Sequence, residues 1–250
     1  AQCLDSATTA NYNTAVGKAA LGTDTTGSQN TAVGCTSMLS NTTGNFNVAV
    51  GVDSLKNNTT ADKNTAVGTY ALDANTTGPK NTALGYGTLS ANTTGSYNTS
   101  VGFAAGNVTT TGHSNTHIGA ESGEAVTEGE YNTSLGAYAL KATTTPHYNT
   151  AIGSRAMEDN TTGNRNTAVG YNSLANNTTG HQQTAVGYNS LGDGTTGMYN
   201  TAVGYESLDA LTDAERNAAL GNHALGVLTT GDNNTGCGMD ARNNVTTGNE

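Results

Sequence analysis

The sequence predicts an all-β fold, a parallel β-solenoid (β-roll) in which each coil is one copy of a 17-residue repeat. The first observation behind this prediction is a segment related to Asn-Thr-Ala-Val-Gly, which begins every 17 residues from residue 13 to residue 234, fourteen times in all. The second is the composition, because 34% hydrophobic residues, 5% aromatic residues and no Trp are too few for an ordinary globular core. The third is the period, which is too short for helical-pair repeats of about 33 residues or more.

The repeat sets the expected organisation of the whole chain. We number the positions of each repeat from 0, the Asn, to 16. If every coil pairs with the next at the inter-strand spacing of ~4.8 Å, residues 1–250 form a single continuous solenoid of about 14–15 coils, roughly 70 Å long and without distinct caps. Low hydrophobicity is also typical of disordered chains. A disordered chain, however, has no reason to keep one register through fourteen repeats.

Two corners of different chemistry are predicted in each coil. Position 14 is usually Gly but is Pro146 in one repeat, and Pro fixes a negative φ, so this corner does not require a left-handed residue. Position 4 never carries a side chain, which predicts a positive φ or close contact with another backbone. It is Gly in all fourteen copies, beginning with Gly17, Gly34, Gly51, Gly68 and Gly85.

The Thr-Ala-Val segment at positions 1–3 is expected to form a short strand, with alternate side chains on opposite faces. We expect Val16 and Val33 to face the coil interior together with the Leu or Met of position 8. Ala15 and Ala32 then face outward, in a column of small residues suited to close approach of another backbone, and this predicts a homo-oligomeric contact. The alternative is that Ala fills a cramped interior while Thr faces out.

The Asn at position 0 is expected to form a ladder. It is present in thirteen of fourteen copies, starting with Asn13 and Asn30, and Gln183 is the exception. Stacked Asn side chains can hydrogen-bond from one coil to the next, as they do in cross-β structures.

The Ala column is interrupted at Ser100, His117 and Ser134, and position 8 is Gly106 and Gly123 in two of the same repeats. If three chains meet along this column, three copies of His117 converge on the oligomer axis and form a candidate metal site, because imidazoles are suitable ligands for transition metals. The alternatives are a tolerated polar patch and a device that fixes the register.

The stretch "NTAVGYNSLANNTTG", residues 166–180, resembles the tandem repeats of phage tail-fibre and fibre-like surface proteins. It is more distantly similar to the "NSVAIG" repeats in the heads of trimeric autotransporter adhesins. The resemblance implies a homotrimeric, left-handed parallel β-roll that acts as an adhesive or spacer shaft. It also implies a location outside the cell, on a cell surface or on a virion.

Charge and motifs narrow the function further. A net charge of −10 with nine Lys and Arg makes a nucleic-acid partner improbable, and no apolar run reaches the ~20 residues of a membrane span. No nucleophile elbow, phosphate loop or calcium-roll motif is present, so we expect no enzyme activity and no cofactor. The expected partner is the protein itself, with a cell-surface receptor or a glycan as a further candidate. The predicted function is a non-enzymatic fibre or filament shaft with an adhesive role.

The sequence is also compatible with two other functions. Subunits could stack head to tail into a filament of single-chain solenoids, in which case Cys3 and Cys237 could meet across the junction; the alternative for these residues is free, buried thiols. The second alternative function is ice binding by the solenoid, because Thr occupies position 1 in twelve of fourteen repeats. The predicted inward orientation of this Thr disfavours ice binding.

Overall fold

The structure is a computed structural model that describes residues 3–248. The chain divides into two compact units, unit 1 up to residue 128 and unit 2 from residue 129, which we describe separately. Each unit contains seven strands of three residues, and no helix occurs among residues 3–248. The strands of unit 1 are β1 (Thr14–Val16), β2 (Thr31–Val33), β3 (Val48–Val50), β4 (Thr65–Val67), β5 (Thr82–Leu84), β6 (Thr99–Val101) and β7 (Thr116–Ile118). Those of unit 2 are β8 (Thr133–Leu135), β9 (Thr150–Ile152), β10 (Thr167–Val169), β11 (Thr184–Val186), β12 (Thr201–Val203), β13 (Ala218–Leu220) and β14 (Thr235–Cys237).

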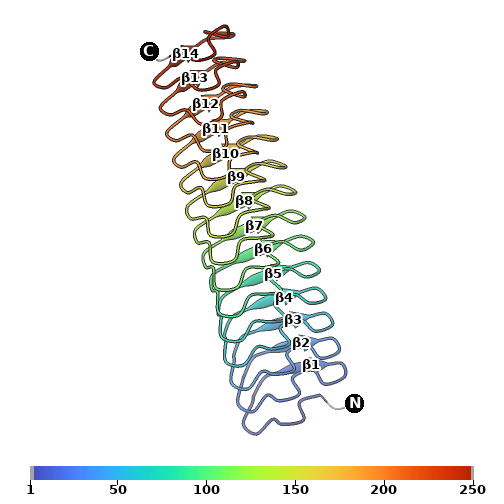
Figure 1. The fold of residues 1–250 in the computed structure, drawn as a ribbon. Helices are drawn as coiled ribbons and strands as arrows, with labels where there is room; N and C mark the ends of the chain where they lie inside the picture. The colour runs from blue at the N-terminus through green and yellow to red at the C-terminus, as the bar shows by residue number, and fades with distance from the viewer. Residues whose placement is uncertain (1–2, 249–250) are drawn as a thin grey trace. The chain divides into compact units, whose positions relative to one another are not determined.

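Within each unit, every strand pairs in parallel with the strand one repeat away, and equivalent positions lie opposite each other. Thr14 pairs with Thr31 in unit 1, for example, and Thr167 pairs with Thr184 in unit 2. Figure 1 shows the strands of each unit following one another in chain order, one per coil. The predicted β-solenoid with one 17-residue repeat per coil is therefore confirmed. Its left-handed sense and its continuity over residues 1–250 stay predictions.

The orientation predicted for the strand side chains is wrong. Ala32 is completely buried, whereas Val16 is 57% exposed and Val33 is half-buried. The reason is space, because the Leu or Met of position 8 lies inside every coil in which it occurs and leaves room opposite it only for a methyl group. The branched Thr and Val side chains therefore lie on the outer surface of the coil, and the expected oligomeric contact along the Ala column is overturned.

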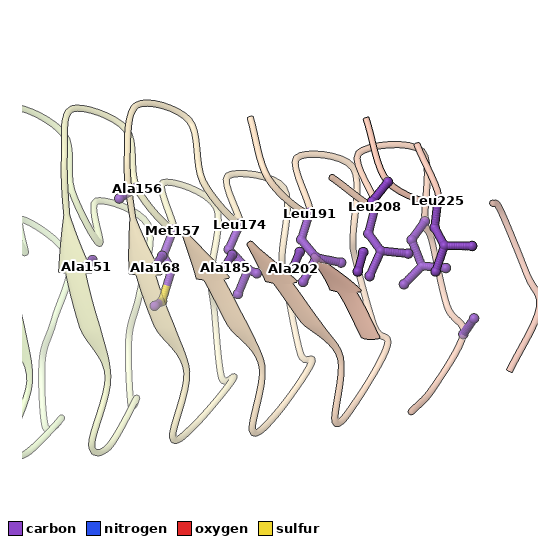
Figure 2. Close-up of a cluster of buried hydrophobic side chains, with 14 of the residues drawn as sticks. Ala151, Ala156, Met157, Ala168, Leu174, Ala185, Leu191, Ala202, Leu208 and Leu225 are labelled. Atoms are coloured by element: carbon purple, nitrogen blue, oxygen red, sulfur yellow. The ribbon is translucent and has the colours of Figure 1, made fainter. Parts of the chain in front are cut away.

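The interior is a narrow column of Ala and Leu in each unit. In unit 1, position 8 contributes completely buried residues such as Leu55 and Leu72, with the Ala of positions 2 and 7 beside them. Figure 2 shows the same arrangement in unit 2, where Met157 and Leu174 lie over Ala168 and Ala185.

The Gly at position 4 turns the backbone sharply after each strand. Its φ lies between +116° and +143° throughout the described coils. A Cβ on Gly51 would lie 2.5 Å from the carbonyl oxygen of Gly68 in the next coil, which is closer than carbon and oxygen atoms can approach. The predicted requirement for Gly at this position is confirmed. Position 14, as expected, has no positive φ.

Three further positions of each coil are left-handed although most of them carry side chains. Positions 6, 8 and 16 have φ values near +55°, as in Tyr70 (+60°), Leu72 (+52°) and Lys63 (+62°). This conformation costs roughly 1–2 kcal/mol at a residue other than Gly. Position 8 keeps Leu nonetheless, because its buried side chain supplies most of the core.

Two columns of amides connect the coils from inside. The side-chain oxygen of Asn47, at position 0, accepts a hydrogen bond of 2.9 Å from the backbone N–H of Asn64 in the next coil. The side-chain amide of Asn64 donates to the carbonyl oxygen of Gly78 in its own coil at 3.0 Å. The expected Asn ladder is therefore confirmed. A second ladder at position 11 was not predicted, and there the Asn75 amide donates to the side-chain oxygen of Asn58 at 2.9 Å.

Candidate functional surface

The strands display two columns of side chains on the outside of the coils, which we call the strand face. One column is position 1, which is Thr except at Val48 and Ala218, and the other is position 3, which is Val, Leu or Ile except at Cys237. Neither column contains Asp, Glu, Lys, Arg or His. Parallel pairing in register repeats both columns every ~4.8 Å along each unit, and about 6.6–6.8 Å separates the two columns across a strand.

Apolar side chains on this face remain accessible to solvent. Leu84 of β5 is 47% exposed and Leu220 of β13 is 55% exposed. A soluble protein rarely leaves a continuous apolar column of this kind uncovered, and such patches usually mark an interaction site.

The strand face of unit 2 is hollowed at its end. Residues of β12, β13 and β14 line an apolar groove of about 350 Å³, with Val203 and Leu220 on its walls. Ala218 contributes to the groove, because it replaces the larger Thr that usually occupies position 1 on this face.

His117 does not lie on an outer face and therefore cannot meet copies of itself on an oligomer axis. It is completely buried inside its coil, and burial lowers the pKa of its imidazole from 6.5 to about 4. A Cβ on Gly123 would collide with imidazole Nδ1, and one on Gly106 would lie 3.2 Å from Cδ2. The imidazole therefore fills the volume that two Leu side chains occupy in other coils. Within residues 3–248, no three His, Cys, Asp or Glu residues are placed to hold a metal ion.

The three cysteines are free thiols on the surface. Cys3 and Cys35 belong to unit 1, Cys237 belongs to unit 2, and all are exposed, so the alternative that they are buried is wrong. Cys237 lies on the strand face and lines its groove. A contact between Cys3 and Cys237 of different subunits stays a prediction.

Aromatic residues form a surface feature that sequence reasoning missed. Tyr or Phe recurs at position 5 of neighbouring repeats, and their rings stack from coil to coil. Tyr171 and Tyr188 stack at a centroid distance of 5.5 Å, and Tyr188 and Tyr205 at 5.1 Å. The signal was present in the sequence as Tyr, Tyr and Tyr at 17-residue intervals from residue 171.

The fold and its surface define a tandem-repeat β-solenoid with an uncharged strand face. No known protein family, curated protein or solved structure matches the chain. A search of the described residues finds no helix long and apolar enough to cross a membrane.

Proposed function

We propose that the protein is a structural, non-enzymatic shaft of an extracellular fibre or filament, and that its chains associate through the strand face as a homotrimer. One observation carries the proposal, namely the uncharged, half-exposed column of Val, Leu and Ile that every unit presents, with Leu84 and Leu220 among its most exposed members. The resemblance to fibre repeats supports the trimer and the location on a cell surface or virion. The association surface is the Thr–Val side of the strands and not the Ala column.

The energetics favour contacts along many coils. Burying a Val side chain completely contributes about 1.5 kcal/mol, so covering a half-exposed one contributes roughly 0.7 kcal/mol per coil. The contribution grows with each added coil, since every repeat presents the same pair of positions. A single Lys placed in the column would instead have to be buried without a partner, which costs several kcal/mol.

The native mass of the assembly tests this proposal. We expect light scattering to give three times the chain mass of 25.2 kDa for the unaltered protein. A variant with Val67→Lys and Val186→Lys, one change on each unit's strand face, should shift the mass toward a single chain. Thr60→Lys, at an exposed corner position away from the strand face, is the matched control and should leave the mass unchanged. A single-chain mass for the unaltered protein at high concentration would refute association, and rods that lengthen with concentration would indicate head-to-tail filaments instead.

Ice binding is a second candidate, because the structure reverses the orientation that disfavoured it. Thr of position 1 faces outward, beside a parallel column of Val, on strands that pair in register. A regular array of hydroxyl and methyl groups of this kind can order water in a lattice. The Thr pairs of the corner are less suited to that role, because hydroxyls such as that of Thr59 donate to the backbone of the next coil.

The two functions make opposite demands on the strand face, since a trimer covers it and an ice-binding protein leaves it free. Thermal hysteresis by a single-chain species, abolished by Thr65→Lys and retained by Thr60→Lys, would support ice binding. A trimer without thermal hysteresis would exclude it.

A further inference from the structure

A groove of about 510 Å³ runs along the surface of unit 1, away from the strand positions, and crosses four successive repeats. One wall consists of aromatic rings. The other wall consists of polar side chains, and these all come from position 9. The aromatic wall is Tyr70, Tyr86 and Phe103, and the polar wall is Asp73, Ser90, Asn107 and Glu124.

The groove exists because two residues between these walls are small. Position 6 is Gly87 and Ala104 here, whereas neighbouring repeats carry larger residues such as Asp53 and Glu121 at that position. A Cβ built on Gly87 meets no atom within 4 Å, so the space beside it is open. The volume is typical of small-ligand sites, which occupy about 300–1,000 Å³.

The aromatic wall is ordered by ring contacts. Tyr86 and Phe103 stack at a centroid distance of 5.6 Å with 8° between their planes, and Tyr70 meets Tyr86 edge-on at 5.8 Å. The next residue in the position-5 column is Ala120, so the stack ends at Phe103, which is 56% exposed. Aromatic rings present apolar surfaces with a negative face, which favour the polarised C–H groups on one side of a sugar ring.

The polar wall offers acceptors and donors at the spacing of the coils, ~4.8 Å. The Ser90 hydroxyl donates to the side-chain oxygen of Asn107. The carboxyl of Asp73 lines the groove. Burial raises its pKa, and hydrogen bonds from the backbone of Asp73 and Ala74 oppose that shift. A carboxyl that lines the groove can accept a hydrogen bond from a hydroxyl group of a ligand.

We propose that this groove binds a neutral glycan, with sugar rings against Tyr86 and Phe103 and hydroxyl groups hydrogen-bonded to the row of Asp73, Ser90, Asn107 and Glu124. No Lys or Arg lines the groove and the chain carries a net charge of −10, so anionic glycans are disfavoured. The proposal specifies the adhesive part of the proposed function, but it does not depend on association through the strand face.

Unit 2 provides an internal comparison. Its aromatic stack, which includes Tyr188 and Tyr205, lies beside larger residues at position 6, namely Asn172, Asn189 and Glu206. The amide of Asn172 donates to Asn189 at 2.7 Å there, and Glu206 lies 3.3 Å from His223. An aromatic stack flanked by larger position-6 residues is therefore available as a control in the same molecule.

Binding to immobilised neutral oligosaccharides, built from hexoses or N-acetylhexosamines, tests the proposal, with sialylated and sulfated glycans and a Lys-rich peptide as comparison probes. Gly87→Tyr fills the groove without a new backbone conformation, because Tyr70 occupies the equivalent position with φ +60° against +61°. We expect Gly87→Tyr to abolish binding, Phe103→Ala to weaken it about tenfold, and Tyr188→Ala to leave it unchanged.

The outcomes separate this proposal from the shaft function, because the native mass is measured on the same samples. Glycan binding by a single-chain species would support the groove and refute the trimer. Absence of binding to every neutral glycan at millimolar concentration would overturn the groove proposal, whatever the mass. Equal binding by Gly87→Tyr, or a preference for the Lys-rich peptide, would overturn it as well.

Discussion

The buried imidazole of His117 should make the stability of unit 1 depend on pH. Its pKa is about 4 in the folded protein and about 6.5 in an unfolded chain. Between these values the unfolded state binds more protons, so the free energy of unfolding rises with pH in this window. The full contribution is present above about pH 6.5, and it is lost as the pH falls to about 4. The difference of about 2.5 pH units corresponds to ~3 kcal/mol.

Hydrogen exchange gives a local measurement of this effect. We expect the amides of β6 and β7 to exchange about two orders of magnitude faster at pH 4 than at pH 6.5, after correction for the intrinsic rates. The control is the triple variant His117→Ala, Gly106→Leu and Gly123→Leu, which restores the Ala and Leu found in most other coils. Its exchange should lose this pH dependence. An equal loss of protection in the variant would refute the assignment to His117.

Three further changes test other parts of the fold. Burial raises the pKa of Asp24, so ionisation of its carboxyl lowers stability as the pH rises through that pKa. Asp24→Asn should therefore raise the denaturant midpoint of unfolding at pH 7. Denaturant titrations over a series of pH values measure this effect. Lys63→Gly should raise the free energy of unfolding by about 1 kcal/mol, because Lys63 is exposed and its backbone has a left-handed conformation. Lys18→Gly, at an exposed position without a positive φ, should instead be neutral or destabilising, and the opposite order would contradict the strain argument. Asn75→Ala should lower the free energy of unfolding by roughly 2–4 kcal/mol, because it breaks the position-11 ladder. Asn57→Ala, at an exposed position, should lower it only slightly. Equal losses in the two variants would show that the ladder contributes nothing.

The repeat period was sufficient to predict the coil, the strand in each repeat and the Gly corner. These features depend on local chemistry that recurs in every copy, so they can be read from one repeat. Gly51, for instance, cannot be replaced because the next coil's backbone lies where its Cβ would be. The Asn ladder at position 0 was predictable for the same reason.

The inward side of the strand was not predictable from alternation alone. Alternation separates Ala32 from Val33 but does not say which of the two is inside, and the larger apolar residue was the natural choice. The coil reverses this choice because Met38, at position 8 of the same repeat, already fills the interior. The error passed to His117, which was expected on an outer surface and lies in the core. Gly106 and Gly123 leave the space that the His117 side chain occupies, and this relation depends on contacts between residues far apart in the repeat.

The left-handed residues and the groove of unit 1 could not be found from propensity. Leu72 and Tyr70 have no sequence preference for a positive φ, and only the packing of the complete coil imposes it. The groove is a property of four repeats together, since it requires small residues at position 6 where the aromatic and polar columns continue.

The parallel pairing of β1 with β2, and of each later pair within a unit, also has a mechanical consequence. Backbone bonds such as that from the Thr31 N–H to the Asn47 carbonyl oxygen, 2.8 Å long, run from one coil to the next. Tension applied along the direction of stacking therefore loads the rungs in series, and the weakest junction opens first. Each coil that opens releases 17 residues of unfolded chain. A stretched unit should therefore lengthen in small, equal steps and dissipate mechanical work at each step.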